Sequence, residues 1–304
     1  MRVAIIENTA VTHHGQVGVA LHEAAARIDL WKPWRDGALP EAGAYDARVV
    51  FGGEQNARAD ATHPYLPKLA RLMKQSADMG IATLGICLGS QVFARGLGAD
   101  NHIGTAGEYG WCEVALTDEA RADPVLSHLP ERFAIMQWHS DTFTLPEGAT
   151  HLAHSPKAAA QCFRYGRAGY AMQFHFEANR AMAADWAREF GEAFEANRPG
   201  WVGDFATHAA RDGAAADAHG LAIARALDDL GVDYIEGGYP GGNPTDTALF
   251  AAERTTKATF TAFGMTKRAG RSAANDPGLQ ALLNSAAAAT CFVAKTWDHQ
   301  VKLA

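Results

Sequence analysis

The stretch TLGICLGSQVF, residues 83–93, places a cysteine between two glycines where one structural pattern gives way to another. The apolar residues before it are typical of a buried strand, and a helix-like pattern follows from Leu88. Gly85 and Gly89 lack the Cβ atoms that would crowd a sharp strand-to-helix turn, so the spacing around Cys87 is that of a nucleophile elbow. The same residues also suit a small buried side chain in an ordinary turn, because cysteine is often buried.

Alternating strands and helices surround this turn. Residues 3–6 and 47–53 contain apolar runs typical of buried strands, and residues 64–80 carry apolar side chains on one face of a helix. This alternation predicts an α/β fold around a largely parallel sheet. Residues 107–174 contain short strand-like runs broken by Gly, Pro and Asp, which predict added antiparallel strands.

The sequence pattern changes twice in the last part of the chain, first to mainly helical and then to alternating strands and helices. Residues 179–197 and 201–231 are predicted to be mainly helical. Strands and helices then alternate again, with strands expected at 232–238, 258–264 and 289–295 and helices at 245–257 and 276–288.

A thiol at the Cys87 turn is suited to nucleophilic chemistry if a base lies within reach. The following helix directs free amides and its dipole toward the sulfur, which favours the thiolate, and the Leu88 amide would face an oxyanion on an attacked carbonyl. His175 and Glu177 end an apolar run, and on an extended segment both side chains project to the same side. The carboxylate could then orient the imidazole, although alone these two would be ordinary surface residues.

The overall composition argues against several classes of function. The 304 residues carry a formal net charge of −7, and no run is rich in Lys and Arg, which argues against nucleic-acid binding. The four cysteines form no Cys-x-x-Cys pair, so neither a disulfide framework nor a zinc site is indicated. No apolar stretch approaches the ~20 residues that span a membrane, and the first apolar run is too short for a signal peptide. We therefore expect a cytoplasmic protein that does not bind membranes.

Two motifs in this order resemble those of a known family. GICLGSQ, followed later by QFHFE, is similar to the Cys-His-Glu signature of the class I glutamine amidotransferases. The resemblance runs from about Met1 to Leu227 and is nearest to stand-alone members similar to the glutaminase half of GMP synthase. It implies a flavodoxin-like sheet in which Cys87 is the nucleophile, His175 the general base and acid, and Glu177 the orienting carboxylate.

The resemblance also implies the residues around the substrate. VVFGGEQNA matches the family's Gly-Gly loop, so the Gly53 amide would join the Leu88 amide in the oxyanion hole. Gln91, in the helix after the turn, matches a glutamine that contacts substrate. The segments GEYGW, residues 107–111, and WHSD fall where members carry similar segments around the glutamine pocket, and WHSD implies binding by Trp138, His139, Ser140 and Asp141.

Two departures from the family pattern affect the geometry and leave the reacting groups in place. The usual His-Pro-Glu is here His175-Phe176-Glu177, which keeps the spacing but loses the fixed φ of proline. The usual proline after Gly-Gly is Glu54.

The reaction implied by the resemblance is hydrolysis of the glutamine side-chain amide to glutamate and ammonia through a thioester, without a cofactor. An ammonia-accepting synthetase would be a natural partner. Two alternatives stay open: a γ-glutamyl hydrolase-like activity on another substrate, and a non-catalytic binding module that kept the fold.

The last quarter resembles a second family. Ala224 to Val301, with LGVDYIEGGYPGGNP as its longest match, is similar to the citramalate and isopropylmalate synthases. Those enzymes are TIM barrels that use a divalent metal, and a barrel needs eight strands and ~250 residues. Only a partial βα segment is present here, and we expect a boundary between a domain at 1–227 and a barrel fragment at 228–304.

The ligands of that second family are incomplete. Arg211-Asp212-Gly213 matches part of its first motif, but Thr207 stands where the metal-binding aspartate is expected, and no His-x-His follows Val232. We therefore expect neither a metal site nor acyl transfer. The fragment could pack on the first domain, pair with a second copy to form a homo-oligomer, or stay poorly ordered.

Overall fold

The computed structural model describes residues 1–228, 234–236, 259–265, 272–285, 287 and 289–293. Contacts divide the chain into two compact units, Met1–Gly231 and Val232–Ala304. No helix among the described residues is both long and apolar enough to cross a membrane.

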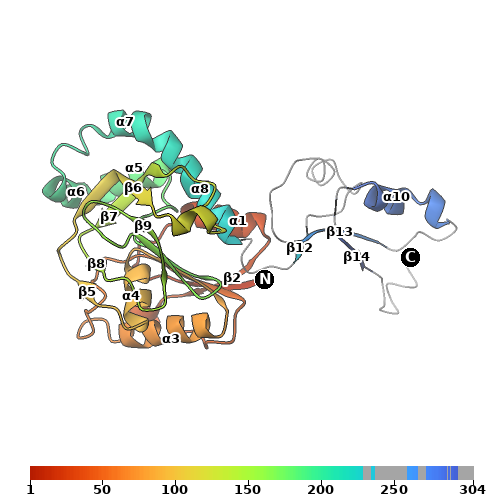
Figure 1. Cartoon of the computed structure of the whole chain (residues 1–304), viewed down its shortest axis with the longest axis horizontal. Helices are drawn as coiled ribbons and strands as arrows, with labels where there is room; N and C mark the ends of the chain where they lie inside the picture. Colours follow the sequence, from red (N-terminus) through yellow and green to blue (C-terminus); the bar gives the residue numbers. More distant parts are fainter. Residues whose placement is uncertain (229–233, 237–258, 266–271, 286, 288, 294–304) are drawn as a thin grey trace. The chain divides into compact units, whose positions relative to one another are not determined.

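A nine-stranded mixed sheet forms the centre of the first unit (Figure 1). Its order is β2 (Arg27–Trp31), β1 (Arg2–Ile6), β3 (Ala47–Val50), β4 (Ala82–Ile86), β11 (Gly169–Met172), β10 (Cys162–Tyr165), β9 (Thr150–His154), β6 (Glu108–Leu116) and β7 (Arg132–His139). The pairs from β2 to β11 are parallel, and those from β11 to β7 are antiparallel. The predictions of an α/β fold and of added antiparallel strands are therefore confirmed.

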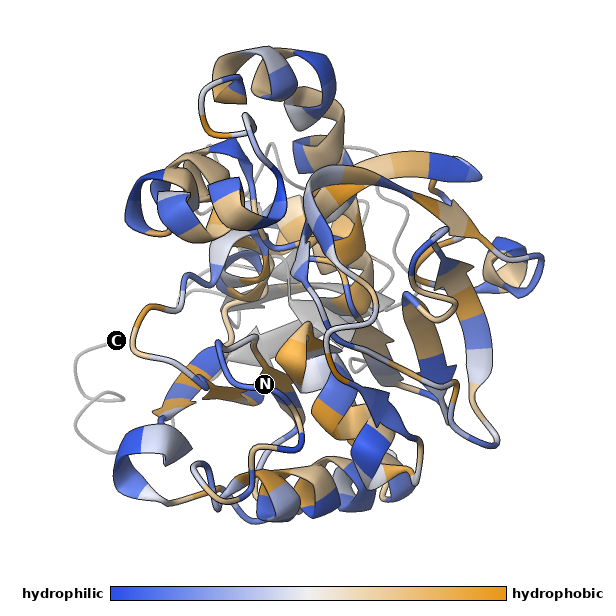
Figure 2. Cartoon of the chain, turned by 90° about the vertical axis from the view of Figure 1, so that its left-hand side faces the viewer, coloured by the Kyte–Doolittle hydropathy of each residue, from blue (hydrophilic) through white to orange (hydrophobic). Residues whose placement is uncertain are grey.

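Two helical layers cover the parallel strands (Figure 1). One face is covered by α1 (Gly15–Glu23), α5 (Arg180–Glu189) and α8 (Ala214–Asp228), and the other by α3 (Leu66–Asp78) and α4 (Leu88–Gly96). Successive strand residues alternate between the two cores: Ile5 packs into the first and Ile6 into the second. The helix α3, at the bottom of Figure 2, carries both hydrophobic and hydrophilic residues, as a helix covering a sheet should.

The antiparallel strands curl back toward the parallel half. His175, which follows β11, forms an antiparallel bridge with Met136 of β7, and its N–H donates to the Met136 carbonyl at 2.8 Å. A separate two-stranded sheet joins β5 (Asn101–His102) to β8 (Thr142–Phe143). The last strand of the large sheet is thus tied directly to the segment that carries His175.

Three local expectations differ from the structure. The strand β2 was not predicted; it is a sheet edge on which Ile28 and Leu30 are exposed, so it lacks the buried pattern of the other strands. The expected helix over 179–197 is broken at Phe190 into α5 and α6 (Gly191–Asn197). The extended segment expected through Glu177 is wrong, because the chain bends after Met172 and turns at 176–177.

The remaining helices of the first unit are short. They are α2 (Pro33–Asp36), α7 (Phe205–His208), a 3-10 turn at Glu119–Ala122 and a wide π turn at Ala209–Gly213 that leads into α8.

The second unit contains a small parallel sheet of β12 (Tyr234–Glu236), β13 (Thr259–Met265) and β14 (Ala289–Val293). The helix α10 (Pro277–Leu283) precedes β14, after a 3-10 turn at Ala273–Asn275, and the Asp276 carboxylate accepts from Gly278 N–H at 2.9 Å to cap it. The predicted strands and this helix are confirmed where the chain is described. The helix predicted for 245–257 lies outside the described residues.

Candidate active site

Cys87 occupies a strained turn between β4 and α4. Its φ of 52° and ψ of −111° lie where L-residues other than glycine are rare. A Cβ on Gly85 would lie 2.4 Å from the Gly89 carbonyl oxygen, and one on Gly89 would lie 2.0 Å from the Val50 carbonyl oxygen. Both glycines are therefore required sterically, because no side chain fits between the strand ends and the helix.

The loop after β3 lies against the thiol. A Cβ on Gly52 would lie 3.4 Å from the Cys87 Cβ and 3.3 Å from the His175 Cε1, so this glycine lets the backbone approach both. The thiol itself is buried, and its Sγ lies 3.7 Å from the Trp138 carbonyl oxygen, to which it donates. Three distant segments thus meet at one sulfur atom.

His175 and Glu177 form a short, buried hydrogen bond. Nδ1 of the imidazole lies 2.7 Å from Oε1 of the carboxylate, and the two residues are 6% and 2% exposed. The ring also stands edge-on to Trp186, with centroids 5.1 Å apart. With Nδ1 held by the carboxylate, Nε2 is the nitrogen left for chemistry.

The electrostatics favour the protonated imidazole. Burial by itself lowers the pKa of His175, but the charge of Glu177 and both the charge and the hydrogen bond of Cys87 outweigh it, so the pKa lies well above its usual value. Such a pair can hold a thiolate beside an imidazolium.

Two backbone amides near the thiol donate to no acceptor in the part of the chain that the structure describes. Leu88 begins α4, so its N–H has no partner inside the helix. Among the described residues, no group accepts from the Gly53 N–H. Both residues line the same cavity as Cys87, so their amides are available to a bound group.

A cavity of about 140 Å³ opens beside Cys87. Its lining includes all seven residues predicted for the oxyanion hole and the substrate: Gly53, Leu88, Gln91, Trp138, His139, Ser140 and Asp141. It also includes Glu54 and Gln55, which follow Gly53 in VVFGGEQNA, and Tyr109, which lies in the GEYGW segment that the resemblance places around the pocket.

Several predicted substrate-binding side chains already have partners within the protein. The Gln91 amide donates to Gln173 Oε1 at 3.1 Å, and the Ser140 hydroxyl donates to Asp141 Oδ1 at 3.2 Å. The Trp138 ring packs against three aromatic rings, those of Trp186, Phe190 and Phe194. The Asp141 carboxylate also accepts from the Gly104 N–H at 2.8 Å. These residues form the wall of the cavity, and their contacts with substrate remain predictions.

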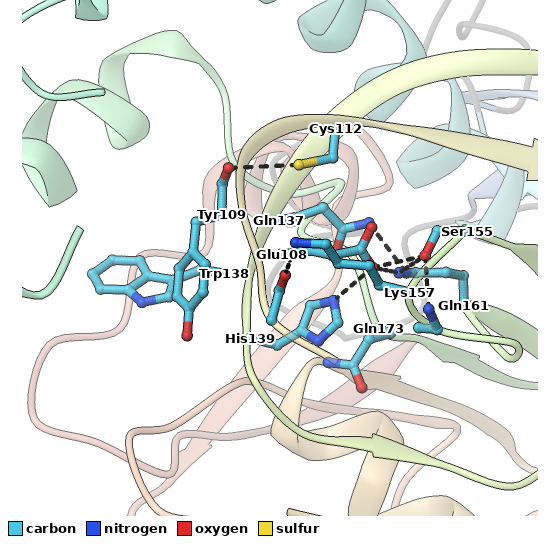
Figure 3. A network of polar contacts seen from close by, with 12 residues as sticks. Glu108, Tyr109, Cys112, Gln137, Trp138, His139, Ser155, Lys157, Gln161 and Gln173 are labelled. Carbon is cyan, nitrogen blue, oxygen red and sulfur yellow. Dashed lines mark hydrogen bonds and ion pairs between the residues drawn. The ribbon is translucent and has the colours of Figure 1, made fainter. Parts of the chain in front are cut away.

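A buried polar network supports that wall (Figure 3). Glu108 Oε2 accepts from Gln161 Nε2 at 2.6 Å and from Ser155 Oγ at 2.7 Å, and it lies 3.4 Å from His139 Nε2. The other nitrogen of His139 lies 2.9 Å from the Asp141 carbonyl oxygen. Glu108 lies in GEYGW, which the resemblance places around the pocket, but the sequence assigns it no role of its own because a single buried carboxylate has no motif.

Comparison with known proteins agrees with this geometry. The family model for glutamine amidotransferase class-I matches residues 19–186. The chain belongs to this family. A glutamine-hydrolysing GMP synthase component from Methanoregula boonei is 30% identical over 177 residues, which are 57% of this chain and 89% of that protein. A glutamine amidotransferase-like protein of Salmonella typhimurium is 33% identical over 141 residues, 45% of this chain and 59% of the relative.

The fold of this class I amidotransferase also matches solved structures. A glutamine amidotransferase from Thermotoga maritima superposes with a TM-score of 0.64 at 26% identity, covering 74% of this chain and 97% of that one. Over a different region, an (R)-citramalate synthase of Streptomyces coelicolor is 52% identical across 88 residues, which are 28% of this chain. The chain spans only 16% of that synthase and 59% of the Salmonella protein.

Proposed function

We propose that the first unit hydrolyses the side-chain amide of glutamine to glutamate and ammonia through a thioester on Cys87. The observation that carries the proposal is the meeting of this thiol, in a strained turn at a helix N-terminus, with the buried His175–Glu177 pair. Family membership makes an enzyme of this general class the expectation, and the two unpartnered amides fit its chemistry.

In the first half of the reaction, the Cys87 thiolate attacks Cδ of glutamine and the carbonyl electron pair moves to oxygen. The Gly53 and Leu88 amides donate to that oxyanion, and loss of one such donor costs ~10²-fold or more in rate. The His175 imidazolium then gives its proton to the amide nitrogen as the C–N bond breaks, so ammonia leaves and a γ-glutamyl thioester remains.

In the second half, neutral His175 takes a proton from water, and the hydroxide attacks the thioester carbonyl. Collapse of this second tetrahedral intermediate breaks the C–S bond, releases glutamate and returns the thiolate beside the imidazolium. Glu177 keeps the imidazole oriented throughout. Gln91 and the wall from Trp138 to Asp141 would hold the amino-acid end of the substrate.

A related substrate is the second candidate. Gamma-glutamyl peptidase 5 of Arabidopsis thaliana is 31% identical over 161 residues, which are 63% of that protein. The same thiol and oxyanion donors would cleave a γ-glutamyl bond to another amine. The first proposal differs in that glutamine hydrolysis releases ammonia. That proposal therefore includes a synthetase partner that would accept the ammonia.

Glutamate release from glutamine tests the proposal directly. The wild-type protein should release glutamate, Cys87→Ala should lose this activity, and Cys112→Ala should keep it. Cys112 is a suitable control because it is a partly buried thiol in the same unit, with its pKa raised by burial. Glutamate release that persists in Cys87→Ala would overturn the assignment. Turnover of a γ-glutamyl dipeptide but not of glutamine would select the second candidate, and turnover of neither would favour a binding module.

A further inference from the structure

A closed group of hydrogen bonds lies directly behind the Gly-Gly loop. The Asn8 side-chain amide donates to the Phe51 carbonyl at 2.7 Å and accepts from the Tyr65 hydroxyl at 3.1 Å. The Gln55 amide donates to that hydroxyl at 2.6 Å and to the Asn8 backbone carbonyl at 3.1 Å. We name Asn8, Gln55 and Tyr65 the loop clamp. Asn8 and Tyr65 are 2% and 4% exposed, so the two bonds of the Asn8 side chain are shielded from water, whereas those of Gln55 are partly buried.

The loop clamp holds both ends of a very short segment. Asn8 fixes the carbonyl of Phe51, and the hydrogen bonds of Gln55 fix the far side, which leaves Gly52, Gly53 and Glu54 between them. A Cβ on Gly53 would lie 3.0 Å from the Asn8 Cβ and 2.8 Å from Gln55 Oε1, so this glycine is enclosed by clamp residues. The same segment lies against Cys87 and His175 through Gly52.

Such a segment needs an external restraint. Two consecutive glycines have wide backbone freedom, and Glu54 does not fix its own φ as a proline would. An oxyanion donor acts only if its N–H points at the developing charge before the reaction begins. Within the segment, the Glu54 carboxylate accepts from Thr9 Oγ1 at 3.3 Å, an exposed side-chain bond that does not hold the Gly53 peptide itself.

We propose that Asn8 and Tyr65 are positioning residues that orient the Gly53 amide for the oxyanion, an inference that rests on the proposed function. Asn8 binds the Phe51 carbonyl before the segment, and the Tyr65 hydroxyl joins the side chains of Asn8 and Gln55; the side-chain hydrogen bonds of both residues go to this group and not to the thiol or the imidazole. Their loss should therefore slow the steps that pass through a tetrahedral oxyanion and leave the nucleophilicity of Cys87 unchanged.

Two thiol reagents separate these effects without glutamine. p-Nitrophenyl acetate acylates a thiolate through a tetrahedral oxyanion, whereas iodoacetamide alkylates it by direct displacement. For Tyr65→Phe and Asn8→Ala we expect the acylation rate at Cys87 to fall about tenfold and the alkylation rate to change less than twofold. Cys87→Ala supplies the background for both reagents. Tyr45→Phe is the matched control, because it removes a part-buried hydroxyl bond to Asp29, and Tyr45 precedes β3 whereas the Gly-Gly loop follows that strand.

Glutamine turnover completes the test. The kcat for glutamate release should fall by the same factor as acylation, and the double variant should lose less than the product of the single losses, because one group of bonds acts as a unit. Equal falls in acylation and alkylation, or acylation within twofold of wild type, would overturn the proposal. If wild type does not hydrolyse glutamine, the proposed function fails, while the ratio of the two reagent rates still decides the role of the loop clamp. Should Asn8→Ala not fold, Tyr65→Phe gives the same decision.

Discussion

The first unit contains two buried histidine–carboxylate pairs, His175–Glu177 and His139–Glu108, and they differ in how the carboxylate is used. Glu177 Oε1 lies 2.7 Å from Nδ1 of His175 and accepts its hydrogen bond, beside the thiol. Glu108 lies 3.4 Å from His139 and instead accepts short hydrogen bonds from Ser155 and Gln161. The Glu177 carboxylate is hydrogen-bonded to its histidine, whereas the Glu108 carboxylate accepts its shortest hydrogen bonds from Ser155 and Gln161.

This difference indicates that the first pair takes part in the chemistry and that the second pair holds the wall of the cavity. His175 has one nitrogen held and one directed to Cys87, which is the arrangement needed to transfer a proton. His139 has one nitrogen on the Asp141 carbonyl and the other facing Glu108, so both nitrogens are turned toward the protein. The two pairs contain the same residue types, but their different hydrogen bonds predict different roles. Matching substitutions in the two pairs can therefore be compared directly.

The largest contrast is expected between the two histidines. His175→Gln should lower kcat for glutamate release about 10³-fold, because general acid–base catalysis contributes ~10²–10⁴. His139→Gln should lower it no more than about tenfold, since the wall is disturbed but proton transfer remains. Steady-state kinetics on both variants measure the contrast, and equal losses would remove the distinction between the pairs.

The pH profile should separate the two carboxylates. Glu177 raises the pKa of His175, so Glu177→Gln should lower that pKa. The imidazolium would then be lost at a lower pH, and the alkaline limb of kcat against pH should shift to lower pH, with kcat falling by about 10²-fold. Glu108→Gln should leave the limb in place. An unmoved limb in Glu177→Gln would mean that another group sets it.

The smallest effect on catalysis is expected in the network of Glu108, Ser155 and Gln161. Glu108→Gln keeps one oxygen as acceptor for Ser155 and Gln161, so KM for glutamine should rise only a few-fold and kcat should stay within twofold. The free energy of unfolding should fall by about 1–2 kcal/mol, because a buried charge-assisted bond is weakened. Urea titration measures this loss. A large fall in kcat with an unchanged KM would instead assign Glu108 to the chemistry.

Much of the fold could be predicted because it depends on local patterns. Buried strands and amphipathic helices are visible in the sequence, and so is the glycine spacing at Cys87, where a Cβ at Gly89 would strike the Val50 backbone. The edge strand β2 was not visible, since Leu30 is 52% exposed and no burial pattern marks it. The break at Phe190 within 179–197 was missed because both halves have helical periodicity.

The site could be predicted only where a motif carries it. Cys87, His175 and Glu177 were named from two motifs, and the structure brings them together, although through a turn and not an extended segment. Tyr109 reaches the cavity within GEYGW, a segment that the resemblance places around the pocket, whereas the contacts of Gln55 with Asn8 and Tyr65 depend on long-range folding, which single-residue patterns do not encode.

The bridge between Met136 and His175 ties the proton donor to two parts of the sheet. His175 follows β11, which pairs in parallel with β4, the strand that leads to Cys87, and its N–H donates to the Met136 carbonyl of β7. The Trp138–Asp141 wall begins within the same β7, so one backbone hydrogen bond connects the wall of the cavity to the imidazole. A change that displaces β7 would therefore affect substrate fit and proton transfer together, while the sulfur keeps its place at the end of β4.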